Sequence, residues 1–125
     1  MPITVKYKAT VYCVKYEGHI TQDEMNQVVD DIYDGSSPKY IIHDVREMDV
    51  TKLKIEEIKT VSKKIRLKIA TDDRTDKLAF IVRDRLSYGL TRMLEAYGFE
   101  FARFKIEIFY NMDDAINWIT GIKKR

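Results

Sequence analysis

The sequence predicts an α/β fold, in which a mostly parallel mixed sheet of about five strands is flanked by about four helices in two or three layers. From the second strand onward, strand-like and helix-like segments alternate along the chain, as in βαβ units. The 125 residues, 45% of them hydrophobic and 34% charged, have the composition of an ordinary globular protein. The length predicts a single domain over residues 1–125.

The first sixteen residues are rich in Val, Thr, Ile and Tyr, which is typical of strands. Two short strands joined near Lys8 and Ala9 are favoured over one, because a single strand of that length is unusual. The sequence leaves the single strand open, since no strong turn dipeptide marks a hairpin.

A helix is expected over residues 20–35. Thr21, followed three residues later by Glu24, has the form of a capping box, and Gly35 suits the C-terminal end. Apolar residues at helical spacing predict its buried face: Met25, Val28, Val29 and Ile32.

The segment YIIHDV, residues 40–45, is apolar on both faces and predicts a central strand. An amphipathic helix is then expected from Lys52 to about Ala70. Its apolar stripe comprises Ile55, Ile58, Val61, Ile65 and Ile69, and its basic outer face comprises Lys52, Lys59, Lys63, Lys64, Arg66 and Lys68. That basic face suits an anionic membrane or partner, although an ordinary solvated face is favoured.

Two further pairs of elements complete the pattern. KLAFIVR, residues 77–83, predicts a buried strand before a helix over residues 86–99, with the inward residues Leu86, Leu90, Met93, Leu94 and Tyr97. Residues 104–110 alternate as a strand, and a short final helix follows. Its N-cap is expected at Asn111 or Asp113, with Gly121 just past its end.

In parallel sheets, ligands and partners gather at the carboxyl ends of the strands. Two such ends are the stretches from Asp44 to Thr51 and from Arg83 to Ser87. Three carboxylates there, on Asp44, Asp49 and Asp84, are candidate oxygen ligands for Mg²⁺. The favoured alternative is that these aspartates cap helices and bond turn backbones.

The start of the helix after Arg83 is a candidate anion pocket. Arg83 and Arg85 lie beside free backbone amides and the positive end of the helix dipole, with Ser87 in the first turn. Solvated arginines and an ordinary cap are the favoured alternative.

No catalytic constellation is recognisable in the sequence. The five glycines do not cluster, which argues against a phosphate loop or a dinucleotide fingerprint, and no serine lies on a nucleophile elbow. His19 and His43 have no partner at metal-ligand spacing, and His43 is expected to be a hydrogen-bonded core residue. The sequence therefore predicts no enzyme activity, no metal and no cofactor.

The cysteine count, the net charge and the apolar runs predict where the protein is located and which partners it lacks. Cys13 alone cannot form an internal disulfide or a metal cluster and is expected to pack as a small hydrophobe. A net charge of +2 does not favour nucleic-acid binding. No N-terminal stretch resembles a signal peptide, and the longest apolar run is LAFIV. A cytoplasmic protein without a transmembrane segment is expected.

Read together, several segments resemble the SpoIIAA-like family of STAS/SEC14-related domains. They are VKYEGHIT, YIIHDVREMDVT, KLAFIVRDRLSYGLTRMLEAYG and KIEIFYNMDDAINWI. The last is similar to the closing strand and helix of the family through Phe109, Ala115 and Trp118. The resemblance covers nearly the whole chain and implies a small mixed sheet flanked by helices.

The resemblance also implies a function. In the anti-sigma-factor antagonists of this family, the loop after the central strand carries a phosphorylatable serine within D-S-S-G. The aligned stretch here runs from Asp49 to Lys52 and places Thr51 at the hydroxyl position, although Val50 and Lys52 depart from the motif. An N-cap for the following helix is the favoured alternative role for Thr51. Relatives in the wider SEC14-related group are associated with binding lipids or small apolar molecules.

Three functions are weighed on these grounds. The favoured one is a non-enzymatic regulatory domain that recognises a protein partner through residues 44–51 and the helix start near Ser87. The second is a small-molecule or lipid-binding domain, in which Arg83 or Arg85 meets an anionic head group above a cavity under LSYGLTRML. The third is an Mg²⁺-dependent phosphoryl-transfer enzyme. The sequence leaves a homodimer open.

Overall fold

The computed structural model describes residues 2–8, 10–33, 39–69, 75–100 and 102–121. Its five strands form one sheet in the order β1-β2-β3-β4-β5. The strands are β1 (Ile3–Lys8), β2 (Val11–Gly18), β3 (Tyr40–Met48), β4 (Lys77–Ile81) and β5 (Lys105–Phe109). β1 pairs antiparallel with β2, and every later pair is parallel. The predicted mixed, mostly parallel sheet and the predicted pair of N-terminal strands are confirmed.

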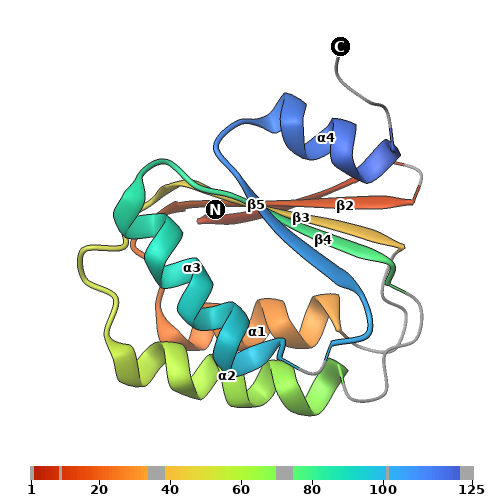
Figure 1. Cartoon of the computed structure of the whole chain (residues 1–125). Helices are drawn as coiled ribbons and strands as arrows, with labels where there is room; N and C mark the ends of the chain where they lie inside the picture. Colours follow the sequence, from red (N-terminus) through yellow and green to blue (C-terminus); the bar gives the residue numbers. More distant parts are fainter. Residues whose placement is uncertain (1, 9, 34–38, 70–74, 101, 122–125) are drawn as a thin grey trace.

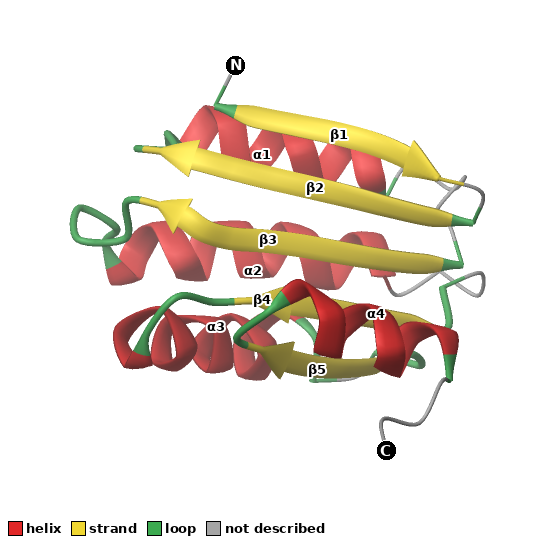
Figure 2. Ribbon diagram, turned by 90° about the horizontal axis from the view of Figure 1, so that it is seen from above, coloured by secondary structure: helices red, strands yellow, loops and turns green. Residues whose placement is uncertain are grey.

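The four helices within the described residues are distributed unequally over the two faces of the sheet. They are α1 (Gln22–Ile32), α2 (Ile55–Ile69), α3 (Arg85–Gly98) and α4 (Met112–Thr120). Figure 1 shows α1, α2 and α3 on one face and α4 alone on the other. Seen from above, α4 lies over β4 and β5, and no helix of the described ranges covers β1 and β2 on that side (Figure 2). The fold therefore has three layers, of which one is a single short helix.

Two apolar clusters follow from this arrangement. The larger lies between the sheet and the three helices and contains strand residues such as Val14, Ile41 and Leu78, all fully buried. The smaller lies under α4 and is built mainly from Ile42, Ile81 and Ile119. Successive side chains of β3 thus lie on opposite faces of the sheet, as the period of two in a strand requires.

Helix starts and ends match the sequence in part. Thr21 and Glu24 form the predicted capping box of α1, Asn111 caps α4, and Gly121 adopts the left-handed conformation past its end. Gly35 and Ala70 lie outside the described residues. α2 begins at Ile55, where the prediction had Lys52, because residues 51–54 form a turn.

The start of α2 explains one wrong burial prediction. The amide of Lys54 donates to the Glu57 carboxylate at 2.9 Å, which is half of a capping box and fixes the helix start there. Ile55 is consequently the first helical residue and is 52% exposed, although it was predicted to lie on the buried stripe. The other four residues of that stripe are buried.

The buried face of α3 also differs from the prediction. Leu86 and Tyr97 are exposed, whereas Ser87, Thr91 and Gly98 are the buried residues of the helix. Small residues face the neighbouring helix: a Cβ on Gly98 would lie 3.4 Å from the Cα of Ser62 in α2. α3 thus approaches α2 closely at Gly98, while Leu90 and Leu94, both predicted to point inward, are partly buried against the larger apolar cluster.

Candidate interaction site at the carboxyl edge of the sheet

The strands β2 to β5 end, and the helices α1 to α3 begin, at one edge of the molecule (Figure 2). This edge, called the carboxyl edge below, carries both stretches that the sequence singled out. β3 continues to Met48, three residues beyond its predicted end, and β4 stops at Ile81, two residues before its predicted end. Asp44 and Arg46 are therefore strand residues, and the loop after β3 begins at Asp49.

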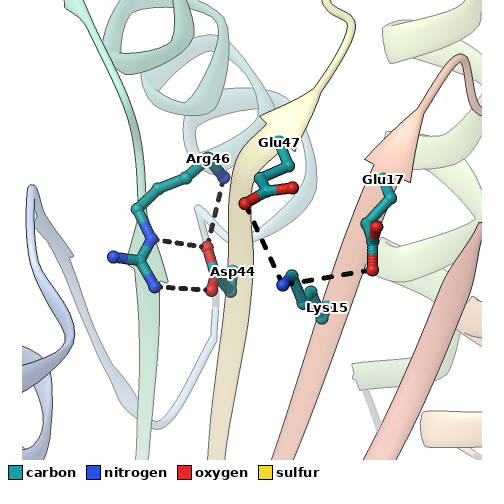
Figure 3. Close-up of polar contacts among 5 residues, drawn as sticks. All are labelled: Lys15, Glu17, Asp44, Arg46 and Glu47. Atoms are coloured by element: carbon teal, nitrogen blue, oxygen red, sulfur yellow. Dashed lines mark hydrogen bonds and ion pairs between the residues drawn. The ribbon is translucent and has the colours of Figure 1, made fainter.

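Asp44 is occupied by an internal ion pair. It is 4% exposed, and its two carboxylate oxygens accept from Nε and Nη2 of Arg46 at 2.9 and 2.8 Å (Figure 3). Burial acts to raise the pKa of Asp44, but the hydrogen bonds from the Arg46 side chain and amide outweigh it and hold that pKa below its usual range. The predicted ligand-binding carboxylate is thus a buried partner of Arg46.

More charges lie beside this pair on the sheet. Lys15 of β2 lies between Glu17 and Glu47, with 4.0 Å from its Nζ to one carboxylate oxygen of each (Figure 3). We call Lys15, Glu17, Asp44, Arg46 and Glu47 the charged ladder. Cys13 is half-buried and packs against the smaller apolar cluster, and burial together with the charge of Asp44 raises the pKa of its thiol. The thiol is therefore not activated as a nucleophile.

The turn after β3 is held by Asp49 and Thr51. One Asp49 oxygen accepts from the Thr51 hydroxyl at 2.6 Å and from the Thr51 amide at 3.0 Å, and these bonds lower the pKa of Asp49. Thr51 is exposed and precedes the first residue of α2 by four positions. The N-cap role predicted for Thr51 is therefore wrong, and its hydroxyl lies on an exposed turn.

The backbone at the start of α3 is capped in the ordinary way. Asp84 is the N-cap and accepts from the Ser87 amide at 2.9 Å, and this backbone hydrogen bond lowers the pKa of Asp84. Arg83 is exposed and its Nε lies 3.4 Å from an Asp84 oxygen. Arg85 is exposed, and no ion pair involving it occurs among the described residues.

The three candidate magnesium ligands are thus engaged separately: Asp44 with Arg46, Asp49 with Thr51 and Asp84 with the α3 amide. Across the described ranges, no group of three or more His, Cys, Asp or Glu side chains is arranged to hold a metal ion. For Asp49 and Asp84 this is the favoured alternative of turn bonding and helix capping, and the less favoured convergence of Asp44, Asp49 and Asp84 on one cation gains no support.

Sequence reasoning missed an exposed aromatic pair at the carboxyl edge. Tyr88 of α3 stacks on Tyr110, which follows β5, with ring centroids 6.0 Å apart and an interplanar angle of 7°. Leu86 is 53% exposed and Tyr110 is 52% exposed. We call Tyr88 and Tyr110 the aromatic patch. The two rings come from different elements that lie far apart in the sequence, so no local pattern reveals the pair.

A cavity of about 110 Å³ lies beneath α3, inside the larger apolar cluster. Its walls come from the sheet and from all three helices of that layer, and they are predominantly apolar. The lining residues include Tyr16, His43, Phe80, Ser87, Leu90 and Phe99. Neither Arg83 nor Arg85 is among the described residues that line it.

His43 is the hydrogen-bonded core histidine that the sequence predicted. It is 6% exposed, its Nδ1 lies 2.9 Å from the Tyr16 hydroxyl, and its ring stacks on Phe80 at 5.1 Å. Burial lowers the pKa of His43 to about 4 and raises the pKa of Tyr16. Both side chains are therefore neutral at physiological pH.

The basic face of α2 is largely engaged within the molecule. Lys64 and Lys68 pair with Asp30 of α1, at 2.8 and 3.2 Å. Arg66 donates to the Tyr97 carbonyl of α3, and the Lys59 ammonium lies 5.8 Å from the Tyr97 ring centroid. These contacts join α2 to its neighbours, which leaves less free positive charge than the sequence suggested. None of the helices in the described ranges has the length and apolar composition of a membrane span.

Comparison with known proteins identifies the fold. No protein-family model and no curated protein matches the chain. A crystal structure of an uncharacterised DUF3478-family protein with a SpoIIAA-like fold, from Shewanella loihica PV-4, matches with a TM-score of 0.60 and 18% identity, over 94% of this chain and 91% of that one. An anti-sigma factor antagonist from Mycobacterium paratuberculosis matches with a TM-score of 0.62 and 15% identity, over 94% and 92%. The chain therefore has a SpoIIAA-like fold, as the sequence resemblance implied.

Proposed function

We propose that this protein is a non-enzymatic regulatory domain that binds a protein partner at the carboxyl edge. The aromatic patch carries the proposal, because tyrosines that are exposed yet stacked in place are typical of interface hot spots. The stacking of Tyr88 on Tyr110 fixes both rings before a partner arrives, so little side-chain freedom is lost on binding. The fold, shared with an anti-sigma factor antagonist, supports a regulatory role.

Charge at the same edge favours a partner with acidic side chains. Arg83 and Arg85 precede Tyr88 in the sequence, and Lys52 and Lys54 lie exposed in the segment before α2. In this proposal Thr51, Asp49, Arg83 and Arg85 contact the partner. Asp44 and Ser87 are buried, so they act by positioning the strand end and the helix start.

Thr51 is the proposed regulatory position. A phosphate would add a charge of about −1.5 to −2 beside the Asp49 carboxylate. It would also remove the hydroxyl proton that Thr51 donates to Asp49 at 2.6 Å, so the turn would rearrange where the partner is expected to bind. Phosphorylation of Thr51 would thus weaken partner binding.

The test measures capture of partner proteins from a lysate of the source organism. Tyr88→Ala combined with Arg85→Glu should reduce the affinity for a captured partner by about tenfold or more, as loss of a hot-spot residue does. Leu67→Ala is the matched control, because Leu67 is 71% exposed on α2, away from the carboxyl edge. Equal affinity of both variants for the partner would contradict the proposal.

The cavity beneath α3 favours a second candidate function, the binding of a small apolar molecule. Its apolar walls suit such a ligand, and it lies under α3, where this function requires a cavity. The head-group role considered for Arg83 and Arg85 gains no support, since neither lines the cavity. A cytoplasmic location, a single domain over residues 1–125 and a homodimer stay proposals, the last of which native mass spectrometry would test.

A further inference from the structure

The cavity beneath α3 is large for the interior of a protein of this size. Interiors are close-packed and hold few voids larger than a water molecule. A cavity of about 150 Å³ lined by Leu, Ile and Phe stays dry and accepts benzene or xenon. The cavity here, at about 110 Å³, is therefore suited to one compact occupant of roughly a single ring.

One polar group in the cavity wall has no partner. Ser87 is 1% exposed, and its hydroxyl makes no hydrogen bond within the described part of the chain. A buried hydroxyl left unpaired is destabilising, so such groups are rare in native proteins and are candidates for contact with a bound molecule. The Tyr16 hydroxyl, in the same wall, is already bonded to His43 at 2.9 Å.

The position of Ser87 in its helix explains why it is unpaired. Ser62 and Thr91, also buried, donate to the carbonyls four residues before them, Ile58 at 2.6 Å and Ser87 at 2.8 Å. Ser87 lies in the first turn of α3, so the residue four positions earlier, Arg83, precedes the Asp84 cap. No helical carbonyl is available to Ser87, and its hydroxyl is left at the cavity wall.

We propose that the cavity binds one small, mainly apolar molecule, of about the size of a single ring, whose hydroxyl or carbonyl oxygen accepts a hydrogen bond from Ser87. This inference rests on the second candidate function and not on docking of a protein at the carboxyl edge. The apolar walls supply the affinity and Ser87 supplies the selection for an oxygen-bearing ligand, because an analogue without that oxygen leaves the hydroxyl unpaired.

The test uses two probes that differ by one hydroxyl, fluorobenzene and 4-fluorophenol. Their binding to the full chain is followed by ¹⁹F NMR, and amide shifts in ¹H–¹⁵N spectra locate the site. Both should bind saturably, with shifts in residues lining the cavity. Ser87→Ala should weaken the binding of 4-fluorophenol by about 3- to 10-fold, as expected for the loss of one hydrogen bond. The affinity for fluorobenzene should not change.

The controls separate the possible failures. Ser87→Ala removes an unpaired buried group, so its melting temperature should equal or exceed that of the wild type, and Leu67→Ala should alter neither affinity. Equal affinity of the wild type and Ser87→Ala for 4-fluorophenol would overturn the role of Ser87. Failure of both probes to saturate the wild type would overturn the cavity as a ligand site. Neither result would alter partner capture at the aromatic patch, which is tested separately.

Discussion

The two faces of the sheet are stabilised in different ways. The face toward α1, α2 and α3 buries a large apolar cluster, within which polar groups such as Tyr16 and His43 are hydrogen-bonded to each other. The opposite face has a small apolar cluster under α4 and, beyond the reach of that helix, the charged ladder. Changes of side-chain volume should therefore matter most on the first face, and changes of charge on the second.

Adjacent isoleucines of β3 give the most direct test of this difference. Ile41 is 0% exposed on the three-helix face, and Ile42 is 3% exposed under α4. Ile41→Ala should lower the free energy of unfolding by about 3–5 kcal/mol and Ile42→Ala by about 2–3 kcal/mol, because the cavity left under a single helix collapses more easily. Urea unfolding measures both, and equal or reversed losses would contradict the comparison.

His43 should make the three-helix face sensitive to mild acid. Its pKa is lowered to about 4 in the folded protein from an ordinary 6.5, so protonation favours the unfolded chain. Stability should be unaffected by this group above pH 6.5 and fall by roughly 3 kcal/mol between pH 6.5 and 4.

The control for His43 is His43→Gln, which keeps a polar partner for Tyr16 but does not titrate. Unfolding free energies measured from pH 7 to pH 4.5 should decline less in this variant than in the wild type. A parallel decline in the two proteins would show that other groups cause it.

On the charged face, Asp44→Asn should lower the free energy of unfolding by about 1–3 kcal/mol, since Arg46 loses its carboxylate partner. Because the folded pKa of Asp44 is lowered, its stabilisation is present above the ordinary carboxyl pKa and is lost as pH falls through the folded value. Glu47→Gln, at an exposed position, should cost within about 0.5 kcal/mol. Thermal unfolding at pH 7 would compare the two, and equal losses would show that burial is not decisive.

Thr51→Glu at the carboxyl edge should likewise have only a small effect on stability. Thr51 is exposed and bonded only to Asp49 among the contacts described, so the unfolding free energy should change by no more than about 1 kcal/mol. Partner affinity should nevertheless fall, since charge is added to the proposed interface. A fall in melting temperature of many degrees would show instead that Thr51 is structural.

The elements of this fold were predictable because each carries a local signal. Period-two and helical spacing located the strands and helices, and capping residues placed the starts of α1 and α4. The start of α2 was misplaced because Asp49 and Thr51 close a turn on themselves, while Lys54, a residue that seldom marks a cap, precedes the helix.

The site was less predictable, because it depends on how elements pack. Leu86 and Tyr97 were assigned inward on their hydrophobicity, but the close approach of α3 to α2 at Gly98 requires small residues on that face. The cavity results from imperfect filling between three helices and a sheet, to which residues far apart in sequence contribute. No local sequence pattern predicts the close approach of the two helices or the presence of the cavity.

The strand order β1-β2-β3-β4-β5 follows the order of the chain without exception. Each strand after the first joins the sheet beside the strand made just before it, and no strand has to insert between two that are already paired. A chain emerging from the ribosome, amino end first, can therefore lengthen its sheet one edge at a time. When Ile81 has emerged, four of the five strands are available to pair, and the later elements complete a surface that already exists.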